Sequence, residues 1–167
     1  MQKPKFYEQQ GVKMRILVFS DSHGDLKLIK KIISEQNEVQ NIIFCGDIED
    51  DILRIKEMFP DKTYHIVRGN NDYNPQFPLQ IITEIATKKI MITHGHTYNV
   101  KSSLSDLVFV AKQNEVDIVV FGHTHIPYSN YDDGLYVLNP GSCGFYKPSY
   151  ATIDISYSGV FVNIVKT

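Results

Sequence analysis

The sequence predicts an α/β fold with a parallel front and an antiparallel back, and three observations lead to this prediction. Short apolar runs rich in β-branched residues alternate with stretches of helical periodicity in the first part of the chain. Later, β-type runs follow one another with only short turns between them. Finally, several buried-type runs end in Asp, Asn or His, as expected where a ligand site lies beyond the carboxyl ends of strands.

The first part of the chain predicts a β-α-β-α-β unit. Its expected elements are a strand at residues 15–19, a helix at 25–36, a strand at 41–45, a helix at 51–59 and a strand at 64–67. In the first helix Leu26, Ile29 and Ile33 recur at helical spacing and define one apolar face. Strands linked by helices in this order form right-handed crossovers, so the unit predicts a parallel sheet.

The second part of the chain predicts mostly antiparallel strands. Residues 81–86 and 89–93 are β-type runs separated only by Thr87-Lys88, which indicates a hairpin. A helix follows, whose apolar face consists of Val100, Leu104, Leu107, Val108 and Ala111. The remaining expected strands are residues 117–121, 135–138, 150–155 and 160–165, with a turn at 157–159 before the last one.

Length and composition favour one globular domain. The chain has 167 residues, of which 43% are hydrophobic and 22% charged, so it can bury a sizeable core without disulfides. We expect residues 14–167 to form this domain. Residues 1–13 are polar and aperiodic, so we expect an N-terminal extension that is mobile or derived from cloning.

Charge and hydropathy exclude several classes of function. The formal net charge is −2 and no basic run occurs, which argues against a nucleic-acid groove or an anionic membrane as the main partner. No apolar run has the length of a membrane span and no signal peptide is evident, so we expect a cytoplasmic protein. Cys45 is interpreted as a buried thiol. Cys143 lies in a loop that can approach a site, but no neighbouring His supports thiol catalysis.

Five predicted strands end in residue types that bind metal ions. The motifs that follow them are Asp21-Ser22-His23, Gly46-Asp47, Gly69-Asn70-Asn71-Asp72, His94-Gly95-His96 and Gly122-His123-Thr124-His125. Each motif alone is weak, because Asp, Asn and Gly are also the common residues of turns. Together they place many ionisable groups at one edge of the fold, which would repel one another and lose solvation without bound metal.

These motifs, in this order, resemble those of the calcineurin-like metallophosphoesterases. The short chain and the Asn139–Ser142 stretch are similar to the small bacterial and archaeal phosphodiesterase branch of that superfamily. The resemblance implies a four-layer α/β/β/α sandwich with mixed sheets and a dinuclear metal site at the carboxyl ends of the strands. It extends over nearly all of the chain from about Met14.

The resemblance also implies which residues bind two divalent ions. The first ion would be bound by Asp21, His23, Asp47 and His125. The second would be bound by Asp47, Asn70, His94 and His123. A bridging Asp47 screens the repulsion between the two ions and fixes their separation. A mixed set of His and carboxylate ligands suits Mn, Fe, Co, Ni or Zn better than Mg or Ca, and we expect Mn²⁺.

The implied activity is hydrolysis of a small phosphate ester, most simply a phosphodiester, by in-line attack of a metal-bound water or hydroxide on phosphorus. Besides Asp47 and Asn70, four residues are candidates for catalysis. Asp50 and Asp72 could orient ligands or relay protons, or could equally be surface or helix-cap carboxylates. Asn71 stands where many relatives carry a proton-donating His, and an amide cannot deliver a proton near neutral pH. His96 is the nearest substitute, with a packed His as the alternative.

Two other functions compete with this interpretation. A retromer scaffold subunit shares the fold without intact metal chemistry, whereas every implied ligand position is filled here. Nucleases of the superfamily generally add a capping domain and need a basic surface, and neither is evident in this sequence. A homo-oligomer remains compatible with the sequence.

Overall fold

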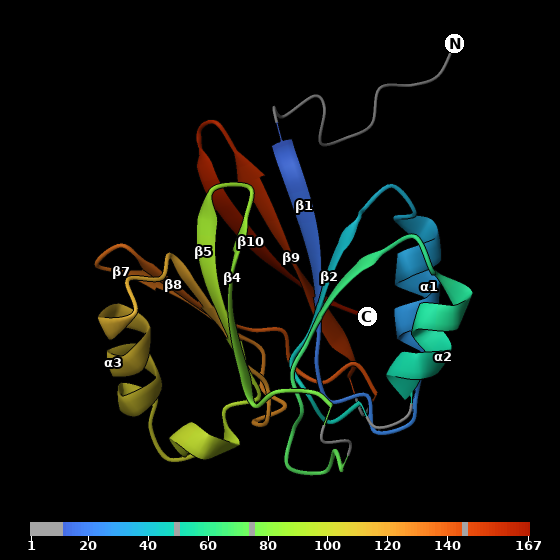
Figure 1. The fold of residues 1–167 in the computed structure, drawn as a ribbon, viewed down its shortest axis with the longest axis horizontal. Coiled ribbons are helices and arrows are strands. Elements are labelled where there is room, and N and C mark those ends of the chain that lie inside the picture. Colours follow the sequence, from blue (N-terminus) through green and yellow to red (C-terminus); the bar gives the residue numbers. More distant parts are fainter. Residues whose placement is uncertain (1–11, 49–50, 74–75, 145–146) are drawn as a thin grey trace.

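Two mixed sheets packed face to face form the centre of this computed structural model, which describes residues 12–48, 51–73, 76–144 and 147–167 (Figure 1). The first described sheet has five strands in the order β10-β9-β1-β2-β3. Their bounds are β1 Val12–Phe19, β2 Asn41–Phe44, β3 Thr63–Ile66, β9 Ser149–Ser156 and β10 Gly159–Lys166. β1, β2 and β3 are parallel, and β9 runs antiparallel to β1 and β10.

The parallel strands are joined by helices α1 (Lys27–Glu35) and α2 (Asp51–Met58). The junction of β1 with β9 carries a cross-strand ion pair. Arg15 lies opposite Asp154 in the register, and its Nε and Nη2 donate to the two carboxylate oxygens over 2.6 and 2.7 Å. Such a two-point guanidinium–carboxylate contact fixes geometry as well as charge, so it helps to set the register of β9 on β1.

The second described sheet has five strands in the order β4-β5-β6-β8-β7. Their bounds are β4 Gln80–Ile85, β5 Lys88–Thr93, β6 Ile118–Val120, β7 Tyr128–Asp132 and β8 Leu135–Asn139. β5, β6 and β8 are parallel, and β4 and β7 are antiparallel edge strands. A short 3₁₀ helix (His96–Tyr98) and α3 (Ser105–Gln113) connect β5 to β6.

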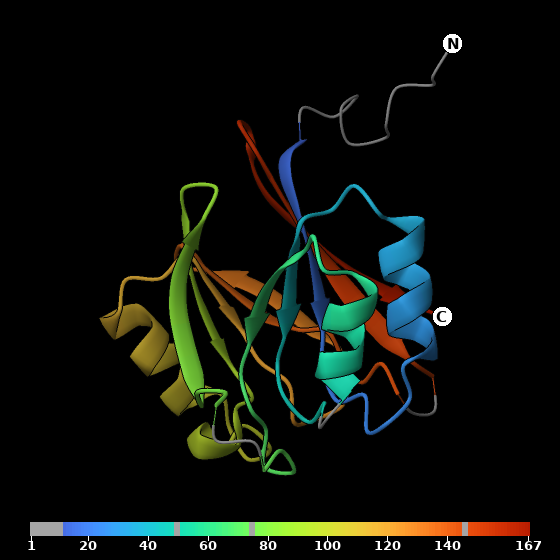
Figure 2. The same cartoon turned by 45° about the vertical axis from the view of Figure 1, so that its right-hand side comes forward.

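Alternation along the strands divides the apolar residues between three layers of contact. In β1, Ile16 and Val18 face the other sheet, whereas Leu17 and Phe19 face α1 and α2. In β5, Ile92 faces inward, whereas Met91 faces α3. Successive side chains of a strand point to opposite faces, so strands that are apolar throughout require cover on both sides. Figure 2 shows the resulting order of helices, sheet, sheet and helix.

The predicted α/β/β/α sandwich is confirmed, and the structure corrects several details. The second part of the chain is less antiparallel than expected, because β5, β6 and β8 are parallel, and the antiparallel pair β9 and β10 completes the first sheet. The hairpin turn is Ala86-Thr87, one residue earlier than expected, with φ of 49° and 71°. β1 begins at Val12, two residues before the expected domain start, and residues 1–11 lie outside the described residues.

Two further differences concern the second sheet. α3 begins at Ser105, since a turn at residues 99–102 occupies the start of the expected helix. β7 was not predicted from the sequence, because its residues are exposed and show no apolar alternation. Among the described residues, no helix is long and apolar enough to cross a membrane.

The carboxyl ends of β1, β2, β3, β5 and β6 lie at one edge of the sandwich. In Figure 1 the loops that follow them gather at the lower end of the view. This arrangement follows from the parallel direction of the central strands in each sheet, and it brings the polar motifs together.

Candidate metal centre

Backbone hydrogen bonds join the motif loops to one another. The amide of Asp21 donates to the carbonyl of Gly46 over 3.0 Å, and the amide of His23 donates to the carbonyl of Asp47 over 3.3 Å. Within the second sheet, the amide of Gly122 donates to the carbonyl of His94 over 3.1 Å, and across the two sheets the amide of His123 donates to Oδ2 of Asp21 over 3.2 Å. The loops therefore form one connected frame, in which the side chains of each motif have fixed neighbours.

Most candidate ligands adopt a backbone conformation that is unusual for residues with a side chain. Positive φ values of 44° to 67° occur at Asp21, His23, Asp47, His123 and His125. A non-glycine residue in this region costs roughly 1 kcal/mol or more, and such residues concentrate at functional sites. The conformation turns each side chain sharply off the end of its strand toward the same centre.

Two glycines make the close approach of the loops possible. A Cβ atom on Gly69 would lie 2.0 Å from Oδ1 of Asp47, and one on Gly122 would lie 2.0 Å from Oγ of Ser20 and 2.8 Å from Oδ2 of Asp21. A side chain at either position would clash with the carboxylate of Asp47 or Asp21, or with the Ser20 hydroxyl that contacts Asp21. Glycine is therefore required by the packing of the centre itself.

The described residues contain two sets of potential metal ligands, and within each set all the ligand atoms lie within 4.8 Å of one another. One comprises Asp21, His23 and His125, and the other comprises Asp21, Asp47 and His94. Oδ1 of Asp21 is 3.1 Å from Nε2 of His125 and 3.9 Å from Nε2 of His23. Oδ2 of Asp47 is 3.9 Å from Nε2 of His23 and 3.5 Å from Nε2 of His94. Both buried carboxylates thus lie between the two sets of imidazoles.

His94 is held so that one particular nitrogen faces the centre. Its Nδ1 lies 2.6 Å from the carbonyl oxygen of Cys45, which can only accept, so Nδ1 carries the proton. In the neutral ring, Nε2 then presents a lone pair toward Asp47. Histidines that bind metals are commonly oriented by such a contact at the other nitrogen.

The remaining predicted ligands, Asn70 and His123, complete the ring of donors. Oδ1 of Asn70 lies 3.1 Å from Nε2 of His94, and Nδ1 of His123 lies 3.2 Å from the same nitrogen. Neither belongs to the two sets above. The structure therefore brings every predicted metal ligand to one centre, which lies at the carboxyl ends of the strands as expected from the sequence.

Asp72 and Asn71 contact the centre through Asp47 and its loop. The buried Asp72 carboxylate accepts from three backbone amides, those of Asp47, Ile48 and Gly69, over 2.7, 3.0 and 2.7 Å. Asn71 donates to the Asp47 carboxylate from its backbone amide over 2.9 Å and from its side-chain amide over 2.6 Å. Asp72 thus ties two motif loops together, and the Asn71 side chain is directed at Asp47.

The other predicted catalytic candidates differ in their placement. The His96 ring lies beside the ligand rings, with centroids 5.4 Å from His94 and 6.1 Å from His123. Its buried Nδ1 has no hydrogen-bond partner among the described residues, and neither has Nε of Arg68. Asp50 lies outside the described residues.

Three polar residues that sequence reasoning missed support the ligand loops. Ser20 Oγ donates to Asp21 Oδ2, and Ser142 Oγ donates to the Asp21 carbonyl over 2.7 Å. The fully buried Asn139 donates to the carbonyl of Gly122 and to Oγ1 of Thr124, over 2.8 and 3.0 Å. Asn139 and Ser142 belong to the Asn139–Ser142 stretch that supported the resemblance. The sequence therefore marked these residues but did not indicate that they support the ligand loops.

Electrostatics in the centre divide the histidines. Contact with the carboxylate of Asp21 raises the pKa of His125 against the opposing effect of burial. Burial, with the charges of His94 and Lys101, lowers the pKa of His123 to about 4. Burial and the neighbouring His94 also lower the pKa of His96. Burial alone would raise the pKa of Asp21, but contacts with His125, His94 and Ser20 lower it overall.

The two thiols take no part in this chemistry. Cys45 and Cys143 are both buried and free. Burial and the charge of Asp21 raise the pKa of each thiol well above its ordinary value. Because the thiolate is the reactive form, neither residue has the properties of a nucleophile.

Several features of the centre fit divalent cations. Oδ1 of Asp21 is buried and accepts no hydrogen bond from the described residues, although His125 is close. Nε2 of His23 and Nε2 of His125 face each other at 3.2 Å, an arrangement of two basic nitrogens that a shared cation would stabilise. Carboxylate, imidazole and amide oxygen donors together match the preferences of first-row transition metals.

Comparison with known proteins agrees with this centre. Residues 14–158 match the family model of the calcineurin-like phosphoesterase superfamily domain. A phosphodiesterase of Methanocaldococcus jannaschii is 33% identical over 160 residues, covering 85% of this chain and 92% of that protein. The crystal structure of a predicted phosphoesterase from Streptococcus pneumoniae is similar, with a TM-score of 0.78 and 26% identity over 92% of this chain and 89% of that one.

A third similarity concerns the fold alone. The structure of vacuolar protein sorting 29 from Cryptosporidium parvum has a TM-score of 0.75, with 18% identity over 93% of this chain and 98% of that one. The family match spans most of the chain and the archaeal relative is similar over nearly its whole length. This protein therefore belongs to the calcineurin-like phosphoesterase superfamily.

Proposed function

We propose that this protein is a metal-dependent phosphodiesterase that hydrolyses a small phosphate ester at the candidate metal centre. The observation that carries the proposal is the convergence of the four ligand histidines on two buried carboxylates, Asp21 and Asp47, with Asp21 shared by both candidate ligand sets. The similarity to an archaeal phosphodiesterase supports the same activity. Mn²⁺ as the ion and a cytoplasmic location are further proposals from the sequence.

The chain's own residues have separable tasks in this proposal. Asp47 would bridge two ions, and the amides of Asn71 hold its carboxylate in place. Asp72 fixes the backbone on either side of that contact. When bound, the two divalent ions would supply the Lewis acidity that activates water and neutralises the phosphate oxygens.

The site offers no strong acid that could protonate the leaving group among the described residues. The Asn71 amide contacts Asp47, and an amide is not an acid near neutral pH. The pKa of His96 is lowered, chiefly by burial, which disfavours the protonated ring that a general acid needs. General acid catalysis is commonly worth about 10² to 10⁴ in rate, so esters with poor leaving groups should react slowly here.

Activity against a panel of esters tests the proposal. With Mn²⁺ we expect rapid hydrolysis of bis(p-nitrophenyl) phosphate and at least about 10²-fold slower turnover of alkyl monoesters, because an aryl oxide departs without protonation. The panel should include phosphomonoesters, phosphodiesters and cyclic nucleotides, each with Mn, Zn, Ni, Fe and Co. Absence of hydrolysis with every metal would contradict the proposal and favour a scaffold role. Rates independent of leaving-group acidity, with chemistry limiting, would reveal a proton donor.

Metal affinity should depend on pH through His125. A histidine must be deprotonated to bind metal, and the raised pKa of His125 strengthens the competition between its proton and the metal ion. At a fixed Mn²⁺ concentration, activity should therefore fall as the pH drops through and below the ordinary imidazole range near 6.5, and excess Mn²⁺ should restore it. His123, with its pKa of about 4, should not compete in this range.

The raised pKa of His125 predicts that the metal-free protein becomes more stable at low pH, whereas metal-dependent activity falls there. A pKa raised in the folded state stabilises that state when the group is protonated, so the contribution of His125 is present below its unfolded pKa and lost as pH rises. Calorimetry at several pH values, with and without Mn²⁺, measures both effects. Loss of activity at low pH that excess Mn²⁺ does not restore would instead indicate an essential proton-transfer group.

A further inference from the structure

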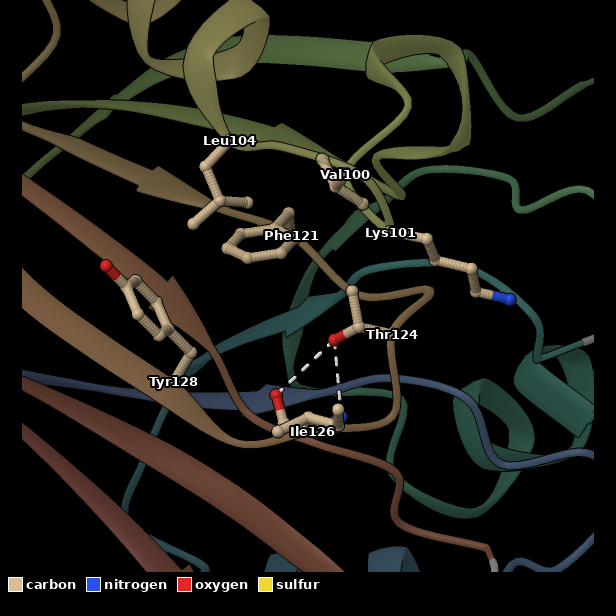
Figure 3. Close-up of a pocket in the computed structure, with 7 residues that line it drawn as sticks. All are labelled: Val100, Lys101, Leu104, Phe121, Thr124, Ile126 and Tyr128. Atoms are coloured by element: carbon tan, nitrogen blue, oxygen red, sulfur yellow. Dashed lines mark hydrogen bonds between the residues drawn. The ribbon is translucent and has the colours of Figure 1, made fainter.

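A pocket of about 330 Å³ lies beside the candidate metal centre. Its lining residues are Val100, Lys101, Leu104, Phe121, Thr124, Ile126 and Tyr128. Figure 3 shows Val100, Leu104 and Phe121 on one side and Ile126 and Tyr128 on the other. Most of the lining is apolar, and the volume lies at the lower end of the range for small-molecule sites.

The pocket and the centre share a wall. Thr124 lines the pocket and stands between His123 and His125 in the chain. Its hydroxyl accepts from the amide of Ile126 over 3.2 Å and from Asn139 over 3.0 Å. Thr124 is thus fixed by the same contacts that support the ligand loop, so the pocket opens directly beside two candidate metal ligands.

Charge is confined to the end of the pocket nearest the centre. In Figure 3 the Lys101 ammonium group lies on the opposite side of the pocket from the Tyr128 hydroxyl. In the same view Lys101 lies on the side of Thr124, the residue that stands between His123 and His125 in the chain. A ligand with a phosphate at the Lys101 end would then meet an apolar interior and a hydroxyl at the far end.

Exposed apolar side chains form part of this pocket. The side chain of Ile126 is 67% exposed and that of Tyr128 is 38% exposed. Phe121, by contrast, is almost fully buried and gives the pocket a fixed aromatic wall. Flat apolar ligand groups gain free energy by covering such side chains, and aromatic rings also gain from contact with aromatic rings.

We propose that this pocket binds one ester group of the substrate, so that the physiological substrate is a phosphodiester carrying an aromatic or other flat ring system. The proposal rests on the proposed function. Lys101 would contact the phosphate, the apolar walls would contact the ring, and the Tyr128 hydroxyl could hydrogen-bond a polar atom on the far edge of the ring. A methyl ester would leave the pocket unfilled.

Kinetics with matched diesters test the proposal. Three p-nitrophenyl diesters share one leaving group and differ in the second ester group, which is methyl, phenyl or 2-naphthyl. With Mn²⁺ we expect kcat/KM to rise at least about tenfold from methyl to naphthyl, mainly through KM, which corresponds to roughly 1.4 kcal/mol. Equal kcat/KM values for the three esters would overturn the proposal while leaving the proposed function intact.

Variants locate the effect within the molecule. Ile126→Asn and, independently, Tyr128→Ala should reduce the naphthyl-to-methyl ratio of kcat/KM about tenfold or to near unity. Phe161→Asn, at a 56% exposed apolar residue of β10, is the matched control and should leave the ratio unchanged. Lys101→Gln should raise KM for all three diesters alike, because they carry the same phosphate charge. If the naphthyl-to-methyl ratio of kcat/KM is unchanged in both Ile126→Asn and Tyr128→Ala, the naphthyl ring binds outside this pocket and the proposal is wrong.

A binding measurement without activity separates the two hypotheses. The fluorescent probe is methyl 2-naphthyl phosphate, titrated into protein freed of metal by a chelator. Wild type and Phe161→Asn should bind it about tenfold more tightly than Ile126→Asn. Equal affinity in all three proteins would overturn the pocket assignment. Binding that depends on Ile126, in a protein that hydrolyses no diester with any metal, would overturn both the substrate assignment and the proposed function.

Discussion

Asp47→Asn should remove tight binding of both metal ions at once. Oδ2 of Asp47 lies 3.5 Å from Nε2 of His94 and 3.9 Å from Nε2 of His23, so this carboxylate is shared between the two groups of ligands. The substitution removes its negative charge and replaces one oxygen by an amide. The assignment that the resemblance implies gives His23 to the first ion only, so His23→Ala should mainly weaken one ion.

Metal analysis after equilibration with Mn²⁺ and dialysis measures this difference. We expect up to two ions per chain in wild type, about one in His23→Ala and well below one in Asp47→Asn, with affinity falling by at least about 10²-fold. Asp61→Asn, at an exposed carboxylate, is the control and should retain both ions. Full occupancy in Asp47→Asn would show that Asp47 does not bridge. Wild type that stays metal-free would favour the scaffold alternative.

The candidate ligands could be predicted from the sequence because each lies within a few residues of the end of a strand, and most of these strands have a strong apolar signal. Asp21 lies two residues after β1 and His94 directly follows β5, and both strands are apolar because both of their faces are covered. The parallel direction of such strands then places their ends together. Sequence patterns alone therefore reached the ligand positions, and the resemblance assigned them to two ions.

Features that depend on pairing between distant segments could not be predicted. β7 is exposed along its length and is stabilised by pairing with β8, so it lacks the apolar alternation that marks a half-buried strand. The joining of β9 to β1 depends partly on Arg15 and Asp154, two charged residues far apart in the chain. Ser142 reaches the carbonyl of Asp21 across a similar separation. No local pattern reports such contacts.

Asp72→Asn should destabilise the protein and also weaken metal binding. The buried Asp72 carboxylate accepts three backbone amides from two loops, and an Asn side chain would turn an NH₂ group toward at least one of these donors. Hydrogen bonds to charged groups are worth about 1.5 to 3 kcal/mol each, so we expect the free energy of unfolding to fall by roughly 2 to 4 kcal/mol. In a protein of this size this lowers Tm by roughly 5 to 15 °C.

The Mn²⁺ affinity of the variant distinguishes a role of Asp72 in positioning the metal ligands from a purely structural role. Because Asp72 holds the amides of Asp47 and Gly69, its loss should reduce Mn²⁺ affinity by about 10- to 100-fold in the molecules that remain folded. Titration by calorimetry well below the Tm of the variant measures this. Asp133→Asn, which removes an exposed ion pair with Lys112, should change neither quantity appreciably. Lower stability with unchanged affinity would mean that Asp72 only supports the fold.

The left-handed conformation of the ligand residues has a consequence for how this fold can change over time. At His23 and His125 a glycine would adopt the same φ without strain, so replacing the imidazole would relieve the backbone while removing a ligand. Selection for folding alone would thus tend to erase the histidines. A descendant that kept only the shape of the sandwich should accumulate Gly or Asn at these positions, and imidazoles that persist there would mark chains still selected to bind metal.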